Sequence, residues 1–110
     1  MEDIKDINWF KKTILPKLNN FEIKYKFFEN GDFGSLNQVE FNSTEIGGNI
    51  DFWELGWLGI FLWDFKTEKE LINVLIEPND LKKIEKEIKV LLNMINKNEI
   101  IFKNSTNKLD

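Results

Sequence analysis

The hydrophobic residues at the start of the chain follow a helical period. They recur every three or four positions, at Ile4, Ile7, Phe10, Ile14 and Leu18. This is the spacing of one face of an α-helix. We expect a helix over residues 3–15, because Pro16 then marks its end.

The chain next alternates between hydrophobic and polar residues, which is the period of a half-buried β-strand. Residues 21–28, FEIKYKFF, form the first such segment, and the polar stretch NGDFGS after it supplies Asn-Gly turn chemistry. Residues 37–43, NQVEFNS, alternate again. In this second strand we expect Val39 and Phe41 to point inward.

Three more segments are typical of strands. Residues 49–54, NIDFWE, follow a Gly47-Gly48 pair that indicates a β-bulge. Residues 57–65, WLGIFLWDF, are hydrophobic at odd and even positions alike. Residues 70–77, ELINVLIE, predict a fifth strand at the edge of the sheet, with a short helix as the alternative. In sequence order these strands predict an antiparallel meander.

The strongest helical pattern comes last, in residues 79–98. Asn79 or Asp80 can cap this helix, and its hydrophobic face is formed by Leu81, Ile84, Ile88, Leu91, Leu92 and Ile95. We interpret the polar residues 104–110 as a frayed tail. The fold class is therefore α+β, an antiparallel meander of four or five strands with an N-terminal and a C-terminal helix packed on one face.

The hairpin between the third and fourth strands decides which side chains share a face. A three-residue loop at residues 54–56 pairs Trp53 with Trp57 and puts Gly56 where a type I turn with a G1 bulge needs positive φ. A two-residue loop, residues 55–56, would shift the pairing by one and turn the aromatic residues of the fourth strand inward. We favour the first register because it matches the glycine.

In that register the two faces of the hairpin differ sharply. One face carries Ile50, Phe52, Leu58, Ile60 and Leu62, and the other carries Asp51, Trp53, Trp57, Phe61 and Trp63. Three tryptophans on a helix-free face would form a large exposed hydrophobic patch unless something covers them. The cover is either the segment EIIFKNS at residues 99–105, or a second copy of the chain, or a partner protein.

The amino-acid composition excludes several classes of function. The 110 residues suffice for one domain, residues 1–110, and contain no cysteine, histidine or arginine. Most common hydrolase and phosphotransfer sites are thereby excluded, and we expect no enzyme activity, no cofactor and no metal. The acidic start is unlike a signal peptide, and the longest hydrophobic run is far too short to span a membrane. We therefore expect a cytoplasmic protein that contacts no membrane.

Charge is distributed unevenly. Residues 27–65 contain seven acidic residues and no lysine, whereas the two ends of the chain are mildly basic. An acidic centre argues against binding to nucleic acid and in favour of a cationic partner. The alternative is that the acidic surface only keeps a small protein soluble.

The run of residues 34–78 resembles a group of small bacterial immunity proteins. The resemblance is carried by VEF at residues 39–41, GGNIDFW at residues 47–53 and the GW that follows. These proteins, the TriTu family among them, neutralise the toxic C-terminal domains of polymorphic or contact-dependent growth-inhibition toxins. The resemblance implies tight binding that blocks a toxin's active site, with no catalytic residue. For a nuclease toxin, an acidic inhibitor would mimic the phosphate charge that the basic groove expects.

On this hypothesis the aromatic residues anchor the toxin domain and the acidic residues steer it. The partner-binding residues are Glu40, Asp51, Trp53, Glu54, Trp57, Phe61, Trp63 and Asp64. One alternative is a regulatory or structural homodimer that uses the same aromatic residues. A second is a small Mg²⁺-dependent, nuclease-like enzyme in which three neighbouring carboxylates, Glu40, Asp51 and Asp64, hold the metal.

Overall fold

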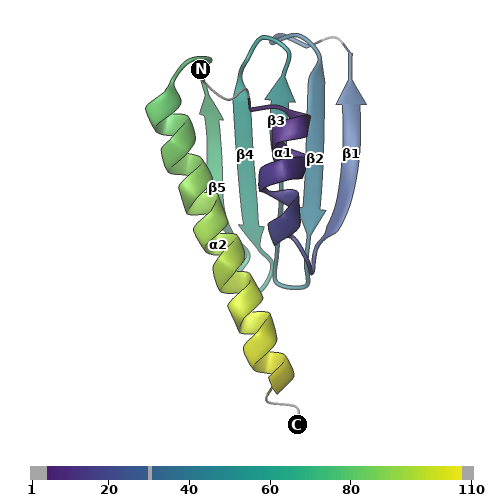
Figure 1. Ribbon diagram of the computed structural model, residues 1–110, viewed down its shortest axis with the longest axis vertical. Helices are drawn as coiled ribbons and strands as arrows, with labels where there is room; N and C mark the ends of the chain where they lie inside the picture. Colours follow the sequence, from purple (N-terminus) through teal and green to yellow (C-terminus); the bar gives the residue numbers. More distant parts are fainter. Residues whose placement is uncertain (1–4, 30, 108–110) are drawn as a thin grey trace.

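The computed structural model of the protein describes residues 5–29 and 31–107, with side chains up to residue 97. It contains a five-stranded antiparallel sheet and two α-helices, which confirms the α+β class. The strands follow one another in sequence order as a meander (Figure 1). They are β1 (Glu22–Phe28), β2 (Leu36–Asn42), β3 (Ile46–Trp53), β4 (Leu58–Asp64) and β5 (Lys69–Ile76).

The N-terminal helix is shorter than its hydrophobic pattern predicts. Helix α1 spans Ile7–Thr13, because the side chain of Asp6 accepts a hydrogen bond from the backbone N–H of Trp9 and caps the helix there. A 3₁₀ turn, η1 (Leu15–Lys17), follows with Pro16 inside it. The predicted start of this helix includes residues 3 and 4, which lie outside the described residues.

The second helix, α2, spans Leu81–Asn107 and is longer than predicted. The backbone N–H of Lys83 donates to the side chain of Asp80, which lies one residue before the helix, as expected of a cap. In Figure 1, α2 crosses in front of β5 and its C-terminal end runs beyond the sheet. Of the polar tail, residues 104–107 belong to this helix, and residues 108–110 lie outside the described residues.

The β3–β4 hairpin adopts the predicted register. Phe52 pairs with Leu58, and the backbone N–H of Trp53 donates to the carbonyl of Trp57 at 3.1 Å, so that residues 54–56 form the loop. Gly56 has a φ of +96°, the left-handed conformation that this loop requires at its last position. The side chains of β3 and β4 therefore face the sides predicted for them.

The hydrophobic core lies on one face of the sheet, called the core face below, and joins it to both helices. Phe10 and Ile14 from the N-terminal helical segment are fully buried, and the ring of Trp9 meets Phe52 edge to face at a centroid distance of 6.3 Å. Figure 1 shows α1 and α2 in front of the sheet. The strands contribute Val39, Phe41, Ile46, Ile50, Phe52, Leu58, Ile60, Leu62, Ile72 and Ile76, and α2 contributes Ile84, Ile88, Leu91 and Ile95.

Two local predictions have different outcomes. Residues 70–76 are a strand and not a helix, and β5 lies at the sheet edge as expected. The predicted bulge at Gly47 and Gly48 is wrong, because the pairing of β3 with both neighbours continues through these residues without a shift. The glycines instead permit close contacts: a side chain at Gly47 would collide with Asn42 and Phe65. The only irregularity recorded in the described pairing lies in the β4–β5 ladder.

Candidate partner-binding face

The other face of the sheet, called the aromatic face below, carries the aromatic residues of the central hairpin. Trp53, Phe61 and Trp63 are half-buried, and they alternate along β3 and β4 with fully buried residues of the core face. Strand pairing fixes what lies beside them: Asn49 is opposite Phe61. On the far side of β4, Asn73 of β5 is also paired with Phe61.

Trp57 and Trp53 meet at one end of this face through a residue that the sequence analysis missed. The ring of Phe33, in the loop between β1 and β2, stacks on Trp57 at 4.2 Å with an interplanar angle of 16°. It also meets Trp53 edge to face at 5.5 Å. The only signal in the sequence was an aromatic residue within the polar stretch NGDFGS. The aromatic residues predicted to share this face therefore form two groups. One is a three-ring cluster beside the β3–β4 loop, and the other lies further along β4.

That second group consists of Phe61 and Trp63. Their rings are nearly parallel, at 18°, with centroids 6.4 Å apart. Both side chains are half-buried, so they belong neither to the buried core nor to the fully exposed surface. The fourth tryptophan, Trp9, belongs to the core face through its contact with Phe52.

Two adjoining hollows open on the aromatic face. The first, of about 230 Å³, includes Asp51, Gly59 and Leu75 in its lining. The second, of about 290 Å³, lies over Gly47. Asn49 and Phe61 line both. The full linings are Asn49, Asp51, Trp53, Gly59, Ile60, Phe61, Asn73, Val74 and Leu75 for the first, and Glu40, Asn42, Gly47, Gly48, Asn49, Phe61, Trp63 and Phe65 for the second.

Asp51 lies at the centre of the aromatic face and is held by two side-chain amides. Its Oδ1 atom accepts a hydrogen bond from Gln38 Nε2 at 2.8 Å and another from Asn49 Nδ2 at 3.1 Å. Burial raises the pKa of this carboxyl group above its ordinary value, although both hydrogen bonds act in the opposite direction. Asp51 is thus a fixed, partly desolvated carboxylate between aromatic side chains.

Two of the other predicted acidic residues lie near the same face. Glu40 forms an ion pair with Lys26 of β1 at 2.7 Å, so its charge is largely matched within the sheet. Glu54 is exposed in the β3–β4 loop, where its Oε1 atom accepts a 3.3 Å hydrogen bond from the backbone N–H of Ser35. The acidic character predicted for this face is therefore concentrated at Asp51 and at the loop.

Asp64 does not lie on the aromatic face. It has the same parity as Ile60 and Leu62, and it lines a hollow on the helix side together with Met94 of α2. Its carboxylate accepts hydrogen bonds from the backbone N–H groups of Thr67 and Lys66, which lower its pKa and stabilise the β4–β5 turn. Asp64 is therefore separated from the other predicted partner-binding residues by the thickness of the sheet.

The three carboxylates considered as a metal site do not come together. Glu40 and Asp51 share the aromatic face, but Asp64 is on the other side of the sheet. Among residues 5–29 and 31–97, whose side chains are described, no group of three or more acidic, histidine or cysteine side chains could hold a metal ion. In the same residues, no helix has the length and hydrophobicity needed to cross a membrane.

Comparisons with known proteins give no relative. No protein-family model matches the chain, and no significant match is found among curated proteins or solved structures.

Proposed function

We propose that this protein is an immunity protein, which binds a cognate bacterial toxin domain in the cytoplasm and blocks its basic active-site groove. The proposal includes the arrangement of two helices packed on one face of the sheet, which leaves the aromatic face for the toxin. The toxin domain is most simply a nuclease, since its groove must attract phosphate and would equally attract a carboxylate. The protein itself performs no reaction in this scheme.

The observation that carries the proposal is the set of half-buried aromatic side chains on the aromatic face. Trp53, Phe61 and Trp63 stand around hollows whose lining contains carboxylates and no lysine. Large aromatic residues set in shallow hollows are typical binding hot spots, because they bury much area and lose little conformational entropy. From the loops, Phe33 packs against Trp53, and Phe65 packs over Gly47.

The segment EIIFKNS, considered above as a cover for the tryptophans, is part of α2. Figure 1 shows this part of the helix running beyond the ends of the strands. This placement favours a separate molecule, rather than residues 99–105 of the same chain, as the cover of the aromatic face. A toxin domain and a second copy of the chain remain as the two possible occupants, and the acidic charge at Asp51 favours a basic toxin over an equally acidic copy.

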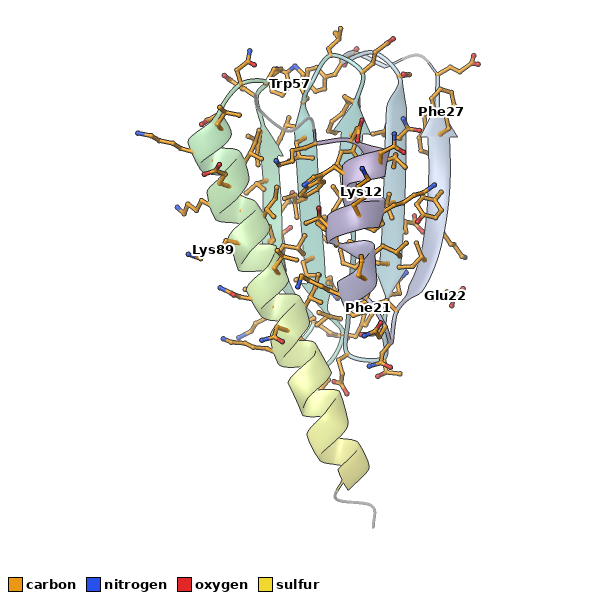
Figure 2. All side chains as sticks on the ribbon, viewed as in Figure 1. Lys12, Phe21, Glu22, Phe27, Trp57 and Lys89 are labelled. Atoms are coloured by element: carbon orange, nitrogen blue, oxygen red, sulfur yellow. The ribbon has the colours of Figure 1, made fainter. Side chains whose placement is uncertain are left out.

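The test is rescue of cells that express the toxic C-terminal domain encoded by the adjacent upstream gene. We expect the wild-type protein to restore growth and to co-purify with that domain. Phe61→Ala should abolish rescue. Phe27→Ala is the matched control, since Phe27 is 58% exposed on β1 and shares the parity of the core face (Figure 2).

Failure of the wild-type protein to rescue or to co-purify would overturn the proposal. A stable dimer whose formation Phe61→Ala abolishes would assign the aromatic face to a second copy instead. Size measurement of the purified protein over a range of concentrations distinguishes these outcomes.

A further inference from the structure

We propose that the hollow over Gly59 is a subsite for a single arginine side chain of the partner. The guanidinium group would lie against the ring of Phe61 and donate hydrogen bonds to the carboxylate of Asp51. The inference rests on the proposed function only for the identity of the partner, because the subsite itself is defined by residues of this chain.

The carboxylate is oriented for an incoming donor. Both described hydrogen bonds to Asp51 end on Oδ1, which fixes the group and leaves Oδ2 free of a described partner. Oδ2 is directed toward Gly59, since a side-chain carbon built on that glycine would lie 3.3 Å from it. Among the side chains that the structure describes, in residues 5–29 and 31–97, the ion pairs are Lys26 with Glu40 and Lys66 with Glu45, and neither includes Asp51.

Because residue 59 has no side chain, the Trp53 ring and the Asp51 side chain can lie close over the backbone of β4. Gly59 is buried, and a side-chain carbon there would lie 3.1 Å from the Trp53 ring and 3.3 Å from Asp51. Phe61, two residues further along β4, stands on the same face of the strand. The hollow that Asp51, Trp53 and Phe61 line therefore forms a slot with two aromatic rings beside one carboxylate. A flat cation fits such a slot, because it can stack on a ring while its edge donates to the carboxylate.

The remaining polar groups of the lining also suit a donor-rich cation. The amide nitrogen of Asn49 already donates to Asp51, and that of Asn73 donates to Glu70 at 2.8 Å. In each case the amide oxygen is left as an acceptor. The lining contains no lysine, so an incoming cation meets the Asp51 carboxylate, amide oxygens and aromatic rings without a competing cation among the lining residues. Guanidinium has five N–H donors in one plane, whereas the ammonium group of lysine has three and does not stack. Arginine is therefore the favoured side chain.

The probe is N-acetyl-L-arginine methylamide, titrated into ¹⁵N-labelled full-length protein. We expect saturable shifts of the side-chain amide signals of Gln38 and Asn49 and of the indole N–H signal of Trp53. The citrulline derivative has the same shape without the charge and should give no saturable shift. The lysine derivative should bind more weakly than the arginine derivative.

Two variants locate the binding. Asp51→Asn keeps the size and the acceptor oxygen but removes the charge, and should weaken binding about tenfold or more, as expected for a hydrogen bond to a charged group. Gly59→Val should fill the slot and abolish binding. Because the added atoms also press on Trp53, Asp51→Asn decides the matter if Gly59→Val does not fold. Glu85→Gln, an exposed change on α2, serves as the control and should bind like the wild type.

The outcomes separate the two proposals. Equal responses to the arginine and citrulline derivatives, or unchanged binding by Asp51→Asn, would overturn the arginine subsite. The titration contains no toxin, so failure of toxin rescue overturns the proposed function without affecting the titration. Rescue that Phe61→Ala abolishes, together with no binding of the arginine derivative, would keep the proposed function and remove the subsite.

Discussion

Asp51 of β3 lies directly opposite Gly59 of β4, so the central carboxylate of the aromatic face is flanked by a residue that adds no side chain. On the same face, Gly47 lies opposite Trp63, and there Asn42 and Phe65 lie above the glycine. Both glycines therefore let neighbouring side chains pack closely. At Gly59 these neighbours are Trp53 and Asp51, so this glycine sets how closely the carboxylate and the ring approach β4.

Burial on the two faces predicts different effects for the same substitution. Leu62 is fully buried on the core face, whereas Leu75 of β5 is 46% exposed on the aromatic face. Leu62→Ala should reduce the free energy of unfolding by about 2–5 kcal/mol, through lost transfer energy and a cavity. Leu75→Ala should cost less than about 1 kcal/mol. Urea denaturation of both variants is the measurement, and equal losses would contradict the assignment of the faces.

The register of the central hairpin was predictable because one residue determined it. Gly56 is the last loop residue in the three-residue register, which needs positive φ there only, whereas a two-residue type I′ or II′ loop would need positive φ at Leu55. Once the loop was fixed, the alternation of strand residues placed Phe52, Ile60 and Leu62 in the core and the tryptophans opposite. Local backbone chemistry and the period of a strand were sufficient for this part of the fold.

Contacts between distant loops were not predictable in the same way. Phe33 stacks on Trp57 because the β1–β2 and β3–β4 loops meet at one end of the sheet, which no local pattern encodes. The hydrogen bond from the backbone N–H of Lys66 to Asp64 was not anticipated either, because it depends on how the β4–β5 turn folds back on the end of β4. The Lys26–Glu40 ion pair likewise depends on the β1–β2 register, so the neutralised charge of Glu40 could not be anticipated.

The role of Gly56 can be tested with two substitutions that add the same first side-chain carbon. Gly56→Ala should destabilise the protein by about 1–2 kcal/mol, because a residue with a side chain is strained at positive φ. Gly56→Asn should cost less, since asparagine tolerates this conformation better. Both variants place a carbon about 3.2 Å from Pro78, so the difference between their denaturation midpoints isolates the backbone effect. A smaller loss for alanine than for asparagine would contradict it.

Trp57 allows the roles of folding and binding to be separated. Its ring is half-buried and stacked on Phe33, an interaction worth about 0.5–1.5 kcal/mol beyond the buried area. We expect Trp57→Ala to lower stability by about 1–2 kcal/mol and to abolish toxin neutralisation. Phe41→Ala, at a fully buried position, should lower stability by about 3–5 kcal/mol.

Thermal unfolding and cell rescue should be measured on the same Trp57 variant. A loss of stability as large as that of Phe41→Ala would assign Trp57 to the core. Retained rescue would remove it from the proposed interface.

The charge on the aromatic face predicts how fast the toxin associates. Glu40→Lys removes the partner of Lys26 and adds a positive charge on this face, so association with the toxin domain should slow. Glu85→Lys changes the net charge equally but lies on α2 and should have little effect. Stopped-flow association at several salt concentrations tests both. Equal slowing by the two variants would show that only net charge matters, and rates insensitive to salt would argue against steering altogether.

The pKa of Asp51 predicts that its carboxylate lowers the stability of the folded protein at neutral pH. Burial raises the pKa of this group above the ordinary value of 3.8, which applies in the unfolded chain. As pH rises, the unfolded chain therefore loses this proton first, while the folded protein still holds it. A folded state that binds more protons loses stability with rising pH. The loss begins near the unfolded pKa and is complete above the folded pKa.

Asp51→Asn removes this titration and retains an oxygen that can accept from Gln38 and Asn49. Relative to the wild type, the variant should therefore gain stability as pH rises from about 3 and reach a constant advantage above the folded pKa. Urea midpoints at a series of pH values, with equal denaturant slopes, provide the measurement. If the stability of the variant relative to the wild type falls as pH rises, the hydrogen bonds from the two amides lower the pKa of Asp51 by more than burial raises it. The expected combination of undiminished stability and weakened arginine binding would show that the carboxylate is kept for a ligand, because the folded protein is no less stable without its charge.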